Sequence, residues 1–184
     1  SYYNMDNGST ADYGVLPSAS TMETASNTPL ASNNVSQSIV NQYPNNNYNY
    51  LQTSSVQYND GSIGFLEIPR LDIAVKVYEG ETLESMKYGA GHFEFTSAWD
   101  GNIGVAGHNR GSSGYFEGVK NLRNGDEIIY STKYGTRYYK VVTKEKISDT
   151  DYSWLGWTSD NRITLVTCVE GSSSQRWCIQ AVER

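Results

Sequence analysis

Short runs of alternating apolar and polar residues fill the chain from Gly61 onward. Gly, Asn and Asp turn signals separate these runs, and each run has the length of a β-strand. Several place apolar side chains at every second position, as a half-buried sheet does. The runs are GFLEI (64–68), AVKVYEG (74–80), NIGVAG (102–107), DEIIYST (126–132), TRYYKVVTKEKI (136–147), RITLVTC (162–168) and RWCIQAVE (176–183). This pattern predicts a β-barrel or sandwich of seven or eight strands.

Helical periodicity is confined to two short segments, ETLESMKYG (81–89) and YFEGVKNL (115–122). Apolar residues recur there at spacings of three and four. Such short segments are typical of connections between strands. The predicted fold class is therefore all-β, with short connecting helices.

Residues 1–60 differ sharply from the rest of the chain. They contain eleven Asn, ten Ser and seven Tyr, but no Lys or Arg. This composition offers too little apolar surface to offset the entropy of ordering a chain. We predict an irregular, low-complexity N-terminal extension or linker over 1–60, in which NNVSQSIVNQY (33–43) is the one candidate short helix. The catalytic or binding domain is predicted over 61–184.

Charge and hydropathy exclude two classes of partner. The chain of 184 residues carries a net charge of −6, whereas nucleic-acid binding needs clustered Lys and Arg. No apolar stretch has the length of a membrane span, and the first residues lack the basic and apolar regions of a signal peptide. We expect any membrane anchor to lie upstream of this chain.

Cys168 is the first candidate for chemistry. It closes the run RITLVTC, and RWCIQAVE follows after the loop VEGSSSQ (169–175). Two runs joined in this way predict an antiparallel hairpin, in which Cys168 and Arg176 lie side by side at the loop end. A guanidinium at that place suits the oxyanion that forms when a thiolate attacks a carbonyl.

The proton carrier must be one of two histidines, His92 and His108. His108 follows the run NIGVAG and precedes a Gly/Ser loop, so we expect it at a strand rim, facing solvent and substrate. His92 lies between aromatic residues and is expected to be packed. His108 is the better candidate. Because the sequence places no carboxylate beside it, Cys168 and His108 are predicted to act as a dyad and not as a triad.

Each of these residue types also has a purely structural role. A Cys in an apolar strand is usually a small buried hydrophobe, and we assign that role to Cys178. An isolated His or Arg often makes only local hydrogen bonds or ion pairs. Two Cys and two His could ligate zinc, but their spacing matches no zinc finger or knuckle. We therefore predict no metal site and no required cofactor.

Taken together, the motifs resemble those of a known family. TLVTC (164–168), an Arg eight residues after its Cys, and VAGHN (105–109) stand in the order found in the sortases, cysteine transpeptidases of the Gram-positive bacterial surface. The resemblance covers 61–184, including FLEIPRLDIAVKVYEG (65–80), which is similar to the opening strands of the sortase barrel. The compact spacing is most like class D, although class A and class B sortases share parts of it. The resemblance implies a closed or nearly closed barrel.

The resemblance also implies a role for each residue of the motifs. Cys168 would attack the carbonyl of Thr in an LPxTG-type sorting signal and form a thioacyl-enzyme. His108 would protonate the leaving glycine amine and then deprotonate an incoming amine. Arg176 would hold the substrate and its oxyanion. Thr167 matches a position that stabilises the acyl oxygen, and Ala106 a position that lines the substrate groove.

Further implications concern the surroundings of the site. The segment 144–162 corresponds to the loop that shapes the pocket for the motif's Leu and Pro. The implied partners are proteins with LPxTG-type sorting signals and an amine acceptor, which is a peptidoglycan cross-bridge, lipid II or a pilin lysine. The implied location is the extracellular face of the plasma membrane of a Gram-positive bacterium, through an N-terminal anchor absent from this chain.

Two other functions fit parts of the sequence. One is an L,D-transpeptidase-like peptidoglycan enzyme, in which the His usually lies shortly before the Cys in an HGC-like run, whereas TLVT precedes Cys168 here. The other is a non-catalytic surface β-domain that binds glycan or protein through its fifteen Tyr and four Trp.

Overall fold

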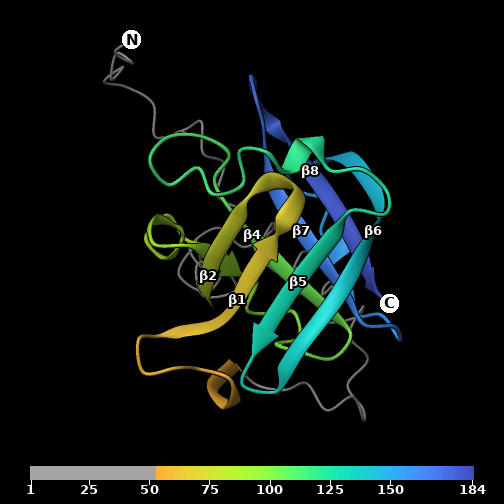
Figure 1. The fold of residues 1–184 in the computed structure, drawn as a ribbon. Coiled ribbons are helices and arrows are strands. Elements are labelled where there is room, and N and C mark those ends of the chain that lie inside the picture. The colour runs from red at the N-terminus through yellow and green to blue at the C-terminus, as the bar shows by residue number, and fades with distance from the viewer. Residues whose placement is uncertain (1–52) are drawn as a thin grey trace, which may run out of the picture.

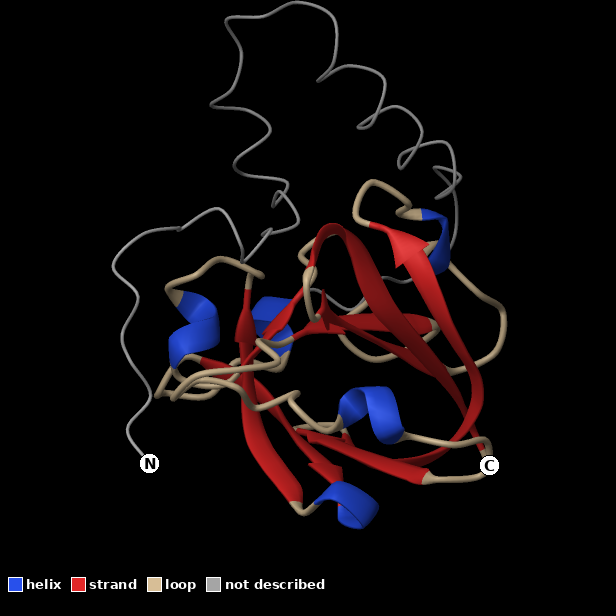
Figure 2. Cartoon of the chain, turned by 90° about the horizontal axis from the view of Figure 1, so that it is seen from above, coloured by secondary structure: helices blue, strands red, loops and turns tan. Residues whose placement is uncertain are grey.

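The computed structural model describes residues 53–184, and they form a closed eight-stranded β-barrel (Figures 1 and 2). The strand order around the barrel is β1-β2-β3-β4-β7-β8-β6-β5. This confirms the predicted all-β fold. The strands are β1 (Ser62–Ile68), β2 (Ile73–Glu79), β3 (Ala90–His92), β4 (Asn102–Ala106), β5 (Glu127–Thr132), β6 (Gly135–Ser148), β7 (Arg162–Val169) and β8 (Ser172–Glu183).

Short 3₁₀ helices connect the strands, as the sequence predicted. Two of them, η4 and η5, lie inside the segments with helical periodicity. None of the helices in 53–184 has the length and apolar character needed to cross a membrane. The candidate helix at 33–43 lies outside the described residues. The helices are η2 (Thr53–Ser55), η3 (Pro69–Leu71), η4 (Ser85–Lys87), η5 (Val119–Asn121) and η6 (Ser153–Leu155).

Two parallel pairings interrupt an otherwise antiparallel barrel. β2 pairs with β3, and β4 pairs with β7, in parallel, and antiparallel pairing of β1 with β5 closes the barrel. The β4–β7 pair joins segments sixty residues apart, with Ala106 opposite Val166. β3 is the one strand that the sequence pattern did not reveal, because three residues are too few to show alternation.

The alternating apolar positions face the interior of the barrel and form its main core. Leu66, Val77, Ile103, Leu165 and Ile179 are all fully buried there. Each such side chain contributes about 1.5–3 kcal/mol of burial free energy, so the core holds the strands in register. Val56 joins this core, which shows that residues just before Gly61 already pack against the barrel. The boundary at 60/61 stays a prediction.

β7 and β8 form the predicted antiparallel hairpin, with a much shorter loop than expected. β7 runs on to Val169 and β8 begins at Ser172, and these two residues pair. Gly171 has a φ of 75°, which favours glycine at so tight a turn. The segment 169–175, expected to be a loop, is thus mostly strand, because cross-strand hydrogen bonds extend to the turn.

His92 is held inside the fold, in accord with its expected packing. It is fully buried at the end of β3. Its Nδ1 lies 2.8 Å from Glu79 Oε1, and its Nε2 lies 2.8 Å from the carbonyl oxygen of Ser97. Both ring nitrogens therefore have acceptor partners. This arrangement links β2, β3 and the following loop, and leaves His92 no access to solvent.

Candidate active site

Strands β4, β7 and β8 carry a second row of side chains, which points away from the main core. We call this side of the three strands the outer face. Ile103, Val105, Ile163, Leu165 and Ile179 belong to the core, so the residues that alternate with them lie on the outer face. They are Asn102, Gly104 and Ala106 on β4, Thr164, Val166 and Cys168 on β7, and Arg176, Cys178 and Gln180 on β8.

Cys168 and Arg176 are directly paired across β7 and β8, as the hairpin argument predicted. Side chains in such a pair have Cβ atoms about 4.5–5.5 Å apart. Cys168 is partly exposed, whereas Arg176 is only 2% exposed. Arg176 Nη1 donates hydrogen bonds to the carbonyl oxygens of Ser173 (2.9 Å) and Gln175 (2.8 Å), which orient the guanidinium at the start of β8.

The loop that carries His108 is fastened to the end of β7. Gly107 N donates to Val166 O at 3.2 Å and so extends the β4–β7 pairing by one residue. The amide Nδ2 of Asn109 donates to Cys168 O at 2.8 Å. His108 stands between these two attachments. The parallel pairing of β4 with β7 therefore brings the histidine and the cysteine to the same end of the outer face.

His108 is more enclosed than a strand-rim position implied. Its side chain is 8% exposed, because the following loop folds back and Phe116 N donates to His108 O at 2.8 Å. Burial lowers the pKa of His108 below its ordinary value of 6.5, since desolvation disfavours the imidazolium. At pH 7 the ring is therefore neutral at rest. The unfolded state binds this proton more tightly, so the native state loses stability as the pH falls below about 6.5.

Two weaker candidates from the motifs also lie beside this end of the strands. The hydroxyl of Thr167 donates to Gly107 O at 2.7 Å, so in this structure it fastens the His108 loop to β7. Ala106 is buried in a smaller hydrophobic cluster that covers the outer face. The members of this smaller cluster are Met86, Phe93, Ala106, Tyr152, Leu155 and Val166, with Phe95 packed against them.

Cys178 is buried, as predicted, and its side chain lies on the outer face. It is fully buried, and burial raises the pKa of its thiol to about 12. A thiol of this kind forms no thiolate at neutral pH. Among residues 53–184, Cys168 is thus the cysteine suited to nucleophilic attack.

An acidic group lies near Tyr152 of the smaller cluster, since the charge of Glu81 contributes to the raised pKa of that tyrosine. Glu81 is 1% exposed, and burial, together with the nearby carboxylates of Glu94 and Glu79, raises its pKa to about 8. It is therefore largely protonated at neutral pH. In the described part of the chain, no group of three or more His, Cys, Asp or Glu side chains is arranged to hold a metal ion.

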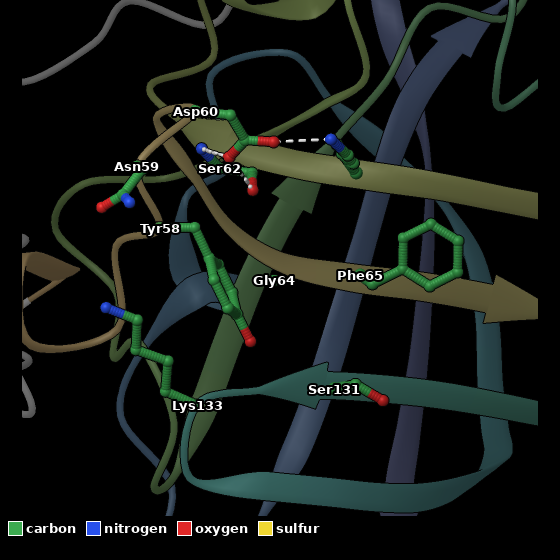
Figure 3. Close-up of a pocket in the computed structure, with 9 residues that line it drawn as sticks. Tyr58, Asn59, Asp60, Ser62, Gly64, Phe65, Ser131 and Lys133 are labelled. Carbon is green, nitrogen blue, oxygen red and sulfur yellow. Dashed lines mark hydrogen bonds and ion pairs between the residues drawn. The ribbon is translucent and has the colours of Figure 1, made fainter.

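A separate pocket of about 670 Å³ lies at the other end of the barrel (Figure 3). Tyr58, Phe65 and Lys133 help to line it, and neither Cys168 nor His108 does. Lys133 lies just before β6, whereas Ile147, near the far end of that 14-residue strand, pairs with Arg176. The pocket and the Cys168–Arg176 pair therefore lie at opposite ends of β6. In the pocket wall, Asp60 binds Lys76 at 2.5 Å. This hydrogen bond, aided by those from Ser62, lowers the pKa of Asp60.

The neutral resting state of His108 leads to a prediction for the reactivity of the thiol. A neutral imidazole does not stabilise a neighbouring thiolate, so the rate at which iodoacetamide alkylates Cys168 should keep rising with pH through the neutral range. A plot of alkylation rate against pH measures this. A plateau already reached below about pH 6 would reveal a resting thiolate–imidazolium pair and contradict the prediction.

Sequence reasoning missed two asparagines that contact the functional segments. Asn109 stands in the motif VAGHN and could have been noticed there, but its hydrogen bond to Cys168 O depends on the β4–β7 pairing. Asn102 begins β4 and binds the segment before β7. The position of an Asn next to a strand gives no signal for contacts with residues so distant in the chain.

Comparisons with known proteins agree with this geometry. The model of the family described as "Sortase domain" matches residues 66–184. Sortase A of Listeria monocytogenes is 32% identical over 111 residues, which cover 59% of this chain and 50% of that protein. Sortase D of Bacillus subtilis is 31% identical over 90 residues, which cover 48% of this chain and 43% of that protein. The chain thus spans about half the length of these curated relatives or less.

Solved structures show the same fold at lower sequence identity. Sortase C-1 of Streptococcus pneumoniae superposes with a TM-score of 0.68 at 21% identity, over 78% of this chain and 76% of that one. A pilus-related sortase C of group B Streptococcus gives a TM-score of 0.67 at 19% identity, over 78% and 77% of the two chains. Because the family model covers more than half of the chain and the barrel matches these structures, this protein belongs to the sortase family.

Proposed function

We propose that this domain is a cysteine transpeptidase that cleaves an LPxTG-type sorting signal after Thr and joins the new carboxyl end to an amine. The observation that carries the proposal is the direct pairing of Cys168 with Arg176, beside a His108 loop that is fastened to Cys168 O. A nucleophile, a cation and a proton carrier at one end of one face are the groups that acyl transfer needs.

In the first half of the reaction, the thiol proton of Cys168 passes to His108, and Sγ attacks the carbonyl carbon of the Thr residue. The guanidinium of Arg176 stabilises the oxyanion that develops. When the tetrahedral intermediate collapses, the C–N bond breaks and His108 gives its proton to the leaving amine. The products are a thioester on Cys168 and a free amino-terminal glycine peptide.

The second half reverses these proton movements. An incoming amine attacks the thioester carbonyl and gives its proton to His108. The C–S bond then breaks, and the sulfur leaves and regains a proton from the imidazolium. Because His108 is neutral before each attack, it is ready to accept a proton. Thiolate and imidazolium coexist only in a minority of resting molecules, so we expect slow turnover.

The proposed partners follow from this chemistry. One is a protein with an LPxTG-type sorting signal, and the other is an amine of a peptidoglycan cross-bridge, lipid II or a pilin lysine. We place the enzyme on the extracellular face of the membrane of a Gram-positive bacterium. Sortases of classes A and D are among its relatives, and the spacing of its motifs favours class D.

Product analysis tests the proposal. The protein is incubated with a panel of LPxTG-type peptides, with and without an amine such as triglycine, and the products are identified by mass spectrometry. We expect cleavage after Thr, a peptide joined to triglycine, and a Cys168 thioester that hydroxylamine releases as a hydroxamate. Binding without cleavage across the panel would instead favour a non-catalytic β-domain, and transfer from a peptidoglycan stem peptide alone would favour an L,D-transpeptidase.

A further inference from the structure

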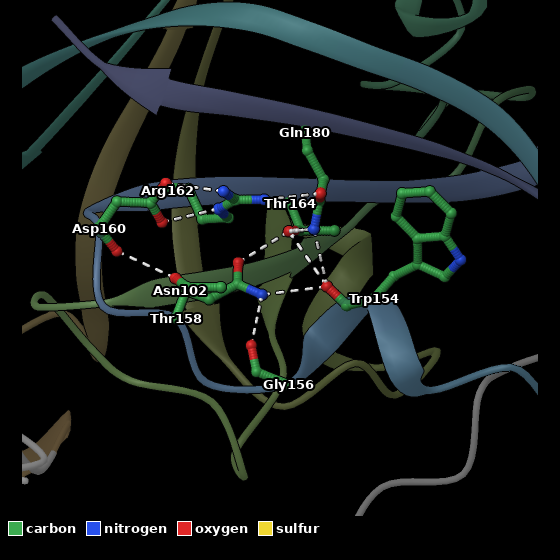
Figure 4. A network of polar contacts seen from close by, with 8 residues as sticks. All are labelled: Asn102, Trp154, Gly156, Thr158, Asp160, Arg162, Thr164 and Gln180. Carbon is green, nitrogen blue, oxygen red and sulfur yellow. Dashed lines mark hydrogen bonds and ion pairs between the residues drawn. The ribbon is translucent and has the colours of Figure 1, made fainter. Parts of the chain in front are cut away.

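A buried polar network occupies the outer face at the end of the strands away from Cys168 (Figure 4). Asn102, Thr164 and Gln180 form its centre, one from each of β4, β7 and β8, and Thr164 pairs directly with Gln180 across the sheet. Asn102 is 1% exposed and Thr164 0%. Because water has almost no access, these side chains depend on one another and on the covering segment for hydrogen bonds.

The covering segment is the connection between β6 and β7, which contains η6. Asn102 Nδ2 donates to two of its carbonyl oxygens, those of Trp154 at 3.0 Å and Gly156 at 2.9 Å. Gln180 Nε2 also donates to Trp154 O, at 3.0 Å. These hydrogen bonds, with a longer contact of 3.4 Å from the Thr164 hydroxyl to Trp154 O, hold the backbone on both sides of Leu155.

The orientation of every group in the network is determined. Arg162 has donors only, and its Nη1 lies 2.9 Å from Gln180 Oε1, so Nε2 of Gln180 must face inward. That nitrogen donates to Thr164 Oγ1 at 3.1 Å, and the Thr164 hydroxyl in turn donates to Asn102 Oδ1 at 2.7 Å. Nδ2 of Asn102 is thereby aimed at the two carbonyls. A bidentate contact to Asp160 fixes Arg162 itself.

The held segment lies against the floor of the outer face. Leu155 packs against Gly104. A Cβ atom at position 104 would lie 2.8 Å from Leu155 Cδ2, which is too close, so β4 needs glycine there. In the same smaller cluster, Tyr152 contacts Phe95 ring to ring, with centroids 6.2 Å apart. The cluster extends to Ala106 and Val166, next to the end of the strands that carries His108 and Cys168.

We infer that Asn102, Thr164 and Gln180 are positioning residues that preset η6 as a wall for the part of the sorting signal upstream of the cleaved bond. They touch none of the groups proposed to react, and they act through Leu155 and Tyr152. This inference rests on the proposed function and deepens it. The polar groups of the network have their hydrogen-bond partners without any ligand, so the wall is formed before the peptide binds. The network thereby sets the selectivity for the apolar first residue of the motif.

Asn102→Asp is the most direct test. The Asp side chain keeps the acceptor for Thr164 and the size of the Asn side chain. In its ionised form it cannot donate to the carbonyls of Trp154 and Gly156, so the assay is run above pH 8, because burial raises the pKa of a carboxyl, as it does for Glu81. Peptides with Leu or Ala at the first motif position are compared in steady-state kinetics. We expect KM for the Leu peptide to rise about tenfold with kcat nearly unchanged, as for the loss of a net hydrogen bond or two, and the preference for Leu over Ala to shrink.

Two further variants keep the test decisive if Asn102→Asp folds poorly. Thr164→Val removes the hydroxyl that orients Asn102 and accepts from Gln180 Nε2, and should show the same rise in KM, whereas Thr164→Ser should restore wild-type values. Asn161→Ala is the matched control, since its amide accepts from Gly101 N (3.0 Å) and donates to Glu183 (2.6 Å) and none of these contacts involves η6. It should leave the Leu preference intact. Cys168 alkylation should be unchanged in all of these variants.

The outcomes separate this inference from the proposed function. Suppose that the wild-type protein cleaves the peptides. If the network variants then keep its KM and selectivity, or if their kcat falls together with the change in KM and Cys168 alkylation is altered, the positioning role is wrong and the function stands. If the wild-type protein cleaves no peptide, the function fails. Hydrogen exchange then tests the network alone. The backbone amides of Leu155 and Gly156 donate to carbonyls of the η6 turn, and they should exchange faster in Asn102→Asp than in the wild type. Equal exchange rates overturn the inference.

Discussion

Replacing Cys168 with alanine should abolish cleavage of sorting-signal peptides and leave the barrel folded. The thiol is the proposed nucleophile, and loss of such a group lowers kcat by at least about 10⁴-fold. Cys168 is partly exposed at the end of β7, so its truncation opens little space in the core. Product formation followed by chromatography measures the activity, and circular dichroism confirms the fold.

Cys178→Ala is the matched control for this experiment. It removes a sulfur that is fully buried, so we expect it to lower the free energy of unfolding by about 1–2 kcal/mol through the cavity left behind, while activity at 25 °C is kept. In the native protein, iodoacetamide should modify Cys168 alone, since burial raises the pKa of Cys178 to about 12. Cleavage that survives in Cys168→Ala but disappears in Cys178→Ala would refute the assignment.

Replacing Arg176 with lysine should give the second-largest effect. Lysine keeps the positive charge but loses the planar donors that Arg176 presents beside Cys168. The loss of a donor that stabilises an oxyanion typically costs about 10²–10³ in kcat, and we expect a decrease of this size with a small change in KM. Steady-state kinetics with the preferred peptide measures it.

Arg176 also has a structural role that must be separated from catalysis. Its bonds to Ser173 O and Gln175 O are lost in Arg176→Ala, and each such hydrogen bond contributes about 0.5–1.5 kcal/mol, so the alanine variant should be less stable than the lysine variant. Arg137→Ala is the matched control, because Arg137 binds Trp99 O at 2.7 Å near the opposite end of β6. We expect it to lose stability and keep kcat. An Arg176→Lys enzyme as active as the wild type would contradict the proposed role.

The hairpin explains why part of the candidate site was predictable. Antiparallel strands joined by a short turn pair residues by their distance from that turn, so the sequence places Cys168 opposite Arg176 without knowledge of the remaining fold. The turn itself proved to be shorter than expected, and a register shift between Cys168 and Val169 accommodates the additional residues of β8, so that Cys168 still pairs with Arg176. The burial of Cys178 was predictable for a similar reason, since it lies inside an apolar run.

The enclosure of His108 and Arg176 was not predictable in the same way. Both were expected at an open rim, and both are more than nine-tenths buried. A polar side chain at the end of a strand becomes buried only if another segment folds over it, as the loop through Phe116 does for His108. The lowered pKa of His108, and with it the expected resting state of the dyad, follows from that cover.

The sequence by itself determined the strand runs, the all-β class and the pairing of Cys168 with Arg176, because alternation and hairpin register are local properties of the chain. Only the tertiary structure decided that His108 joins them, since this requires β4 and β7, far apart in sequence, to pair in parallel. It also decided the network around Asn102, whose hydrogen bonds reach residues more than fifty positions away. Contacts of that range form only once the barrel has closed, and no local pattern encodes them.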